Sequence, residues 1–148
     1  MPADGKVHIG GNSLGALSIS SEGDVKSLHC CLLPHRLLRV VASKSHLSPE
    51  TQDYLNQLDT SYELVSVGSS LKFLLIAEGK ADFYPRFGHT CEWDTAAAHA
   101  ILEGAGGAVE SLGGDTLLYG KVDTLNPWFI AFGCGGPYEL GSGISGYG

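Results

Sequence analysis

The chain has 148 residues, a hydrophobic fraction of 43% and a formal net charge of −7. This length suits one ordinary globular domain. The negative charge argues against binding to a nucleic acid polymer by simple electrostatics, and we find no apolar run long enough for a membrane span. The segment Met1–Gly11 lacks the basic and apolar regions of a secretory signal. We therefore expect a cytoplasmic protein whose four cysteines are reduced thiols.

Residues 1–36 are rich in glycine and serine and show only weak patterning. Within them, the stretches KVHIGG and ALSISS predict two short strands. The segment matches no pattern that we can place, so we treat it as a separate N-terminal segment.

From residue 37 to residue 133, short apolar runs alternate with helical patterns. LLRVVAS, YELVSVG, ADFYPRF and PWFIAFG predict strands, and LSPETQDYLNQL, SSLKFLLIAEGKA and residues 95–103 predict helices. Ser48 suits the N-cap of the first helix, and Pro49 suits its first position. Pro85 indicates an edge strand or a strand end. AVESLGGDTLLYG predicts a strand, a glycine turn and a second short strand.

Strands that alternate with helices predict an α/β domain, with a layered mixed β-sheet flanked by helices. Residues 134–148 are mostly glycine, serine and tyrosine, and we interpret them as a loose tail.

The stretch EWDTAAAHAILEGAGGAV begins at Glu92 and contains the first candidate site residue, Asp94. An aspartate before an alanine-rich run is a good helix N-cap. Its second carboxylate oxygen could still face a cation, but Mg²⁺ takes several oxygen ligands. Glu92 would point the other way in an extended lead-in. Asp94 can therefore be part of a metal site and cannot be all of it.

Four further residues lie where a strand meets a helix or a loop, a position at which ligands often bind in α/β sheets. In VGSSLKF, Ser69 and Lys72 would offer an anion free backbone N–H groups and a positive charge. His46 follows a predicted strand, and Arg86 could bind a phosphate through two hydrogen bonds. Each also has a structural interpretation, as a helix cap or as a solvated surface side chain. Together with Asp94, they suit a phosphate site with bound Mg²⁺.

Four blocks of the sequence resemble the C-terminal half of the inositol monophosphatase superfamily, over about residues 39–132. They are RVVASKSHLSPETQDYL, VGSSLKFLLIAEGKADFYPRFG, EWDTAAAHAILEGAGGAV and LNPWFIAFG, and they occur in the order of the family. Trp-Asp-x-Ala-Ala marks the superfamily. The Ser-x-Ser-His, Gly-Ser-Ser-Leu-Lys-Phe and Tyr-Pro-Arg-Phe stretches resemble its CysQ-type branch of bacterial 3'(2'),5'-bisphosphate nucleotidases.

The resemblance implies a Mg²⁺-dependent phosphatase that converts 3'-phosphoadenosine 5'-phosphate to AMP. Asp94 matches the metal ligand of the family. The positions that match substrate-binding residues are His46, Gly68, Ser69, Lys72 and Arg86. The family's N-terminal half carries further metal ligands, in a Glu-Glu pair and an Asp-Pro-x-Asp-Gly-Thr motif, and neither occurs in this sequence.

We therefore expect half of a phosphatase, inactive as an isolated chain. Its partner would be the missing half or a second copy that covers an exposed apolar face. Two alternatives remain open. The substrate could be an inositol phosphate or a sugar phosphate, or the chain could be a non-catalytic module that binds nucleotides or joins an assembly.

Overall fold

The computed structural model describes residues 5–30, 37–42, 47–58, 60–66 and 71–134. Its strands and helices, in chain order, are β1 (Val7–Gly11), β2 (Gly15–Ile19), β3 (Val25–Ser27), β4 (Leu38–Ala42), α1 (Pro49–Asn56), β5 (Tyr62–Ser66), α2 (Leu71–Ala77), β6 (Phe83–Arg86), α3 (Glu92–Gly104), β7 (Ala108–Ser111) and β8 (Phe129–Phe132). Within these ranges, no helix combines the length and the apolar character that a bilayer crossing requires.

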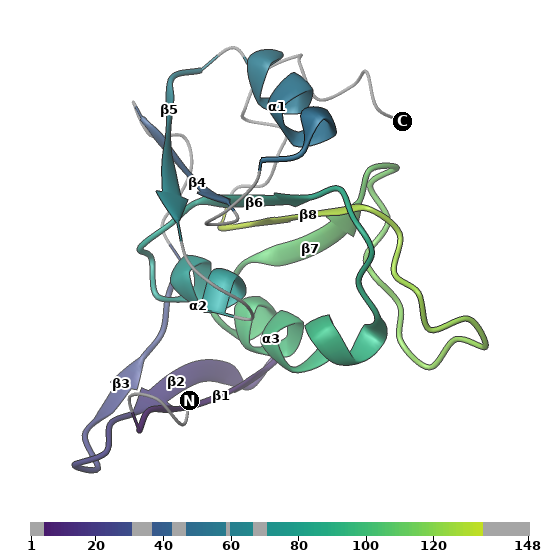
Figure 1. Cartoon of the computed structure of the whole chain (residues 1–148). Coiled ribbons are helices and arrows are strands. Elements are labelled where there is room, and N and C mark those ends of the chain that lie inside the picture. The colour runs from purple at the N-terminus through teal and green to yellow at the C-terminus, as the bar shows by residue number, and fades with distance from the viewer. Residues whose placement is uncertain (1–4, 31–36, 43–46, 59, 67–70, 135–148) are drawn as a thin grey trace.

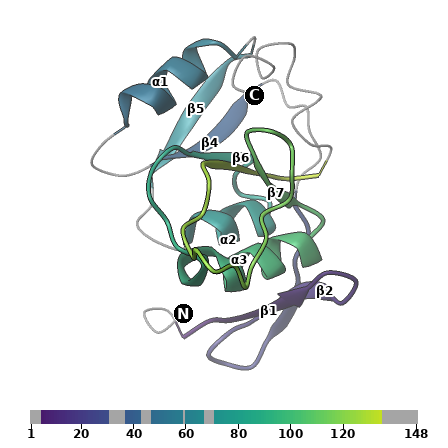
Figure 2. The ribbon, with the colours of Figure 1, turned by 90° about the vertical axis from the view of Figure 1, so that its right-hand side faces the viewer.

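The strands form two sheets. β1, β2 and β3 form a three-stranded antiparallel sheet, and the other five strands form a sheet of order β5-β4-β6-β8-β7. β4 is parallel to both β5 and β6, whereas β8 is antiparallel to both β6 and β7. Helices α2 and α3 lie between the two sheets, and α1 lies on the other side of the larger sheet (Figures 1 and 2). The predicted α/β class, with a layered mixed sheet flanked by helices, is thus confirmed.

Alternate residues of the larger sheet point to opposite faces, as the two-residue period of a strand requires. On β8, Phe129 and Ala131 belong to the core between the sheet and helices α2 and α3. Ile130 and Phe132 belong to a second core cluster, which includes Tyr54 of α1. Because both faces of the sheet are buried at β8, the sequence of this strand reads as a continuous apolar run.

The small sheet packs closely against α3 because glycines line the contact. A Cβ atom at Gly104 of α3 would overlap the carbonyl oxygen of Gly15. A Cβ atom at Gly10 of β1 would lie 2.9 Å from the Cα atom of Ile101. The predicted strands in KVHIGG and ALSISS are confirmed as β1 and β2, and β3 is an additional strand.

Local sequence signals predicted some features of the helices and strands correctly and others wrongly. Thr51 donates its backbone N–H to Ser48 Oγ at 3.2 Å, which confirms Ser48 as the cap of α1. The edge position inferred from Pro85 is wrong because β6 lies in the middle of the larger sheet. The strand-end alternative holds, since the pairing of β6 with β4 is confined to Phe83 and Val40. The second strand predicted in AVESLGGDTLLYG is reduced to an isolated bridge between Glu110 and Thr116.

The prediction that all four cysteines are reduced thiols is wrong for two of them. Cys30 and Cys134 form a disulfide between positions 104 residues apart, with their Cα atoms 6.0 Å from each other. Cys30 precedes the larger sheet in the chain, and Cys134 follows its last strand. Sequence spacing could not reveal this pair, because only the folded chain brings the two residues together. Cys91 remains a free thiol.

Candidate functional site

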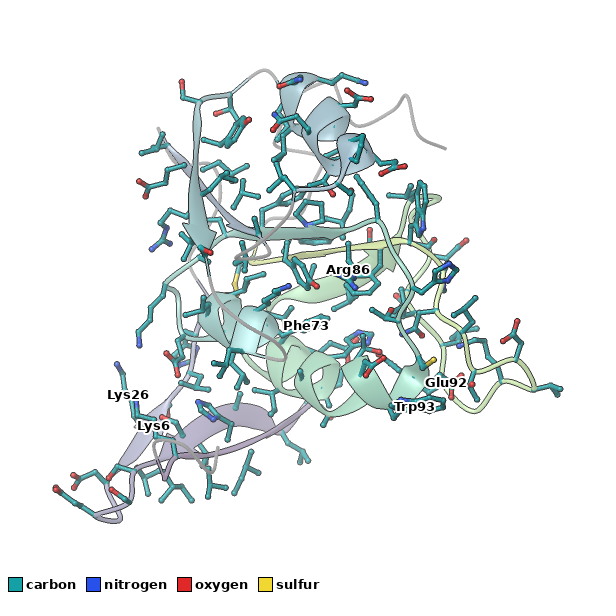
Figure 3. The ribbon with its side chains drawn as sticks, in the orientation of Figure 1. Lys6, Lys26, Phe73, Arg86, Glu92 and Trp93 are labelled. Atoms are coloured by element: carbon teal, nitrogen blue, oxygen red, sulfur yellow. A yellow bond between two sulfur atoms is a disulfide. The ribbon has the colours of Figure 1, made fainter. Side chains whose placement is uncertain are left out.

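A pocket of about 490 Å³ lies between the larger sheet and the start of α3. α2, β6 and α3 each contribute side chains to it, as does the turn before α3. The residues that line it are Lys72, Phe73, Tyr84, Arg86, His89, Thr90, Trp93, Asp94, Thr95 and Phe129. Arg86 and Phe73 lie below the larger sheet, and Trp93 lies at the start of α3 (Figure 3).

The structure brings three of the six site residues predicted from the sequence into this one pocket. Lys72 comes from α2, Arg86 from the end of β6 and Asp94 from the first turn of α3. The other three, His46, Gly68 and Ser69, lie outside the described residues. Their proposed roles therefore stay predictions.

Lys72 is a buried cation. The residue is only 7% exposed, and its Nζ atom lies 5.1 Å from the centre of the Tyr84 ring. Burial, and then the charge of Arg86, lowers the pKa of Lys72 below its ordinary value. The electron-rich face of the tyrosine ring offsets part of this cost. No carboxylate pairs with Lys72 among the residues that the structure describes.

Arg86 adds a second positive charge to the same wall. Its charge opposes the effect of burial, which raises the pKa of Tyr84, while its buried Nε atom has no hydrogen-bond partner in the described part of the chain. A smaller pocket, of about 60 Å³, is also lined by Lys72, Tyr84 and Arg86. Two neighbouring cations that have no carboxylate partner among the described residues are well suited to bind an anion.

Asp94 both caps its helix and faces the pocket, but its position differs from the prediction. Helix α3 begins at Glu92, so Cys91 is the N-cap and Asp94 is the third helical residue. The Oδ2 atom of Asp94 accepts the backbone N–H of Cys91 at 2.8 Å. This reciprocal arrangement is the second half of a capping box, which serves the helix as well as an N-cap aspartate would. The exposed carboxylate keeps its other oxygen for a ligand.

Glu92 also belongs to the helix rather than to an extended lead-in. Its carboxylate accepts Lys121 Nζ at 2.6 Å and the backbone N–H groups of Gly120 and Lys121 at 2.9 and 3.1 Å. These bonds, with that of the Lys121 ammonium the strongest, lower the pKa of Glu92 to about 2. Glu92 therefore fastens the loop between β7 and β8 (residues 112–128) to α3 and is not available to a metal in the pocket.

The described residues do not by themselves fit a Mg²⁺ site. No three histidine, cysteine, aspartate or glutamate side chains among them gather closely enough to hold a metal ion. Asp94 is the acidic residue of the pocket, and one of its oxygens already caps α3. Mg²⁺ usually takes one or two carboxylates together with waters and substrate phosphates.

A buried asparagine holds two pocket residues from behind. Asn126, which is 4% exposed, donates from Nδ2 to the hydroxyls of Thr90 and Thr95 at 3.2 and 3.0 Å. Its backbone N–H bonds to the carbonyl of Thr90 at 2.9 Å. Both threonines line the pocket. Asn126 thereby fixes the turn before α3 relative to the first turn of the helix.

Thr95 continues this chain of polar contacts toward His99, which is buried. Tyr119 Oη lies 3.3 Å from Thr95 Oγ1 and 2.6 Å from His99 Nδ1, and His99 Nε2 lies 3.1 Å from Glu103 Oε1. Burial lowers the pKa of His99, and the nearby Glu103 charge opposes this effect. The sequence carried no signal for Tyr119 or Asn126, because both reach α3 from a distant loop. Thr95 could have been found as the neighbour of Asp94.

The fold is that of a known family. A model of the inositol monophosphatase family matches residues 2–130. The chain belongs to the inositol monophosphatase family, as the sequence resemblance indicated. The match begins within residues 1–36, for which sequence inspection found no relative.

Two comparisons point to one branch of the family. The chain is 52% identical over 91 residues to the 3'(2'),5'-bisphosphate nucleotidase CysQ of Salmonella typhimurium; this covers 61% of the chain and 37% of that protein. The crystal structure of CysQ from Bacteroides thetaiotaomicron superposes with a TM-score of 0.77 at 39% identity, covering 89% of the chain and 55% of that structure. Mycobacterium tuberculosis SuhB shares the fold, with a TM-score of 0.60 at 24% identity. The chain thus spans little more than a third of the CysQ sequence and about half of the solved structures.

Proposed function

We propose that this chain is the phosphate-binding part of a Mg²⁺-dependent phosphomonoesterase that acts on 3'-phosphoadenosine 5'-phosphate and yields AMP. The observation that carries the proposal is the wall formed by Lys72 and Arg86, two cations that no described carboxylate neutralises. Asp94 lines the same pocket, and the sequence resemblance matches it to the family's metal ligand. The names of the CysQ relatives support a bisphosphate nucleotide as the substrate.

Two pockets that share one cationic wall favour a ligand with two phosphate groups. Lys72 and Arg86 border both the large pocket and the small one. A bisphosphate could place one phosphate in each pocket, whereas an inositol monophosphate would leave one of them empty. We therefore place the nucleotide before inositol and sugar phosphates.

Turnover is a separate matter from binding. Because Asp94 is the acidic residue of the described pocket, we propose that the chain binds the nucleotide and that hydrolysis needs further carboxylates. An assay of phosphate release with 3'-phosphoadenosine 5'-phosphate and Mg²⁺ tests this. Turnover on the order of 1–10³ per second, as in ordinary enzymes, would refute it.

Calorimetry tests the binding site itself. We expect 3'-phosphoadenosine 5'-phosphate to bind more tightly than AMP, and AMP more tightly than inositol 1-phosphate. Lys72→Met should weaken nucleotide binding about 30-fold, the cost of one lost charged contact. Lys80→Met is the matched control, since Lys80 pairs with Glu78 at 2.7 Å and does not line the pocket. Equal affinities for the two variants would remove the basis of the proposal.

Replacement of Asp94 distinguishes a metal-dependent enzyme from a non-catalytic nucleotide-binding module. In a metal-dependent enzyme, Asp94→Ala should abolish the effect of Mg²⁺ on nucleotide binding, because the Asp94 carboxylate would be one of the residues that hold the metal. In a non-catalytic binding module, nucleotide affinity should survive Asp94→Ala with and without Mg²⁺ and still fall about 30-fold in Lys72→Met.

A further inference from the structure

Behind the pocket, four polar side chains connect its wall to the protein surface. Thr95 lines the pocket, followed by Tyr119 and then His99, which is 3% exposed. Glu103, with a side chain that is 28% exposed, is the outer end. Three contacts of 3.3, 2.6 and 3.1 Å join them in this order.

The hydroxyl of Tyr119 has a single hydrogen and two partners that could accept it. When His99 is neutral, its Nε2–H group donates to the Glu103 carboxylate, so Nδ1 carries no hydrogen. Tyr119 then has to donate to Nδ1 across the short 2.6 Å contact. In the structure, Tyr119 Oη is the donor to Thr95 Oγ1, but in this protonation state the hydrogen of Tyr119 is committed to Nδ1, so the threonine becomes the donor of the contact.

Uptake of one proton by the His99–Glu103 pair reverses this order. The imidazolium donates from both nitrogens, so Tyr119 becomes an acceptor from Nδ1 and turns its own hydrogen to Thr95 Oγ1. Thr95 already accepts from Asn126 Nδ2 at 3.0 Å. The Thr95 hydroxyl can then donate its hydrogen only to the carbonyl oxygen of Glu92, at the long distance of 3.4 Å, or to an anion in the pocket.

We propose that Tyr119 is a positioning residue that couples proton uptake by the His99–Glu103 pair to a hydrogen-bond donor, the Thr95 hydroxyl, at the pocket wall. This inference deepens the proposed function and rests on it, because it assigns the pocket an anionic ligand. An anion should bind more tightly when the pair is protonated.

Within the described residues, the titratable groups that contact His99 all belong to this network. Glu103 on α3 and Tyr119 on the loop at residues 112–128 are its titratable contacts. α2, β1, β2 and β7 also pack on α3, and within the described residues none of their charged side chains bonds to His99. Because burial lowers the pKa of His99, the change should fall below the ordinary titration range of histidine.

The first test uses the ligand-free chain and NMR. With falling pH, we expect the ring nitrogens of His99 and the signals of Thr95 to shift with one common midpoint. In Tyr119→Phe, His99 should still titrate while Thr95 no longer follows it. Thr95 signals that follow the titration without the tyrosine hydroxyl, or that do not move in the unmodified chain, would overturn the coupling. Thr95→Val, which keeps the side-chain shape, should leave the His99 titration in place and serves as the second variant.

The second test measures sulfate binding against pH, because sulfate keeps its charge over this range. The affinity of the unmodified chain should rise about fivefold as pH falls through the His99 midpoint, the effect of one hydrogen bond. In Tyr119→Phe this rise should be lost. Any contribution of His89, which lines the pocket, should be equal in both proteins. Tyr62→Phe is the matched control, since Tyr62 lies on the distant strand β5.

The two tests separate the inference from the proposed function. An equal rise in the chain and in Tyr119→Phe would overturn the link between the network and the anion. Absence of sulfate binding at every pH would overturn that link together with the anionic pocket, while the ligand-free titration would still decide whether Tyr119 turns.

Discussion

At the scale of single residues, the site is defined by positively charged side chains that are shielded from solvent. Lys72 and Arg86 repel one another, and burial makes the charged lysine costly. This arrangement lowers the stability of the ligand-free protein. An anion that binds between the two cations offsets their repulsion. The same two residues therefore link stability to binding.

Replacement of Lys72 by methionine should stabilise the free chain while it weakens nucleotide binding. Methionine has a similar length and needs no hydration, so we expect a gain in the free energy of unfolding of about 1 kcal/mol. Chemical denaturation measures this gain. Lys80→Met, at an exposed ion pair, should change stability much less. Destabilisation by Lys72→Met would show that the lysine is paired rather than strained.

Glu92 provides a prediction for acid stability. Its pKa of about 2 in the folded chain lies below the ordinary value of glutamate, so the folded state holds the ionised form more strongly. This stabilisation is present above the ordinary value and is lost as pH falls from there to about 2. Glu92→Gln should therefore reduce the loss of stability over this range. Glu63→Gln, on the exposed edge strand β5, is the control, and an unchanged acid profile in Glu92→Gln would contradict the assignment.

At the scale of elements, the decisive contact is that between the small sheet and α3. Glycine at position 104 lets the backbone of Gly15 lie directly on the helix. Nothing in the sequence indicates that these two glycines meet. Short-range patterns identify elements, whereas a close approach between elements depends on residues that are far apart in the chain.

Gly104→Ala should separate the small sheet from α3. The new Cβ atom would overlap a carbonyl oxygen, which cannot move without its strand, so we expect a loss of about 2–3 kcal/mol. Gly113→Ala is the matched control because the nearest atoms to its Cβ are 3.8 Å away. Thermal unfolding of the two variants makes the comparison. A wild-type melting temperature for Gly104→Ala would contradict the packing described above.

Element boundaries were predictable where one residue carries a local signal. Ser48 and Pro49 begin α1 as expected, because both act within one helical turn. Asp94 also contributes to a helix start, but from the third position, since a capping box and an N-cap aspartate look alike in sequence. His99 and Tyr119 show the limit, because their contact joins a helix to a loop twenty residues away.

At the scale of the whole molecule, the small sheet has one covered face and one open face. Val7, Ile19 and Val25 stand side by side in register, as do Ile9 and Leu17 in the next row. Val7 and Ile9 are each 52% exposed, and Val25 is 65% exposed. His8 and Gly10 belong to the opposite face, where His8 contacts Glu78 at 3.0 Å and Gly10 meets α3.

We expect a second copy of the chain to cover this open face at high concentration. Apolar side chains on adjacent strands form the kind of contiguous patch that favours association. Sedimentation velocity should show an average mass that rises with concentration. Val25→Lys should suppress the rise, whereas Leu118→Lys, at a similarly exposed apolar residue on another loop, should not. A mass that stays monomeric throughout would contradict the expectation.

The central claim is that Lys72, Arg86 and Asp94 form one phosphate-binding pocket, and its most direct test is a residue-by-residue map of nucleotide binding. Titration of the ¹⁵N-labelled chain with 3'-phosphoadenosine 5'-phosphate should shift the amide signals of these three residues and of Thr90 and Thr95. Signals from β1 and β2 should stay in place. Shifts confined to the small sheet, or no shifts at millimolar nucleotide, would contradict the claim.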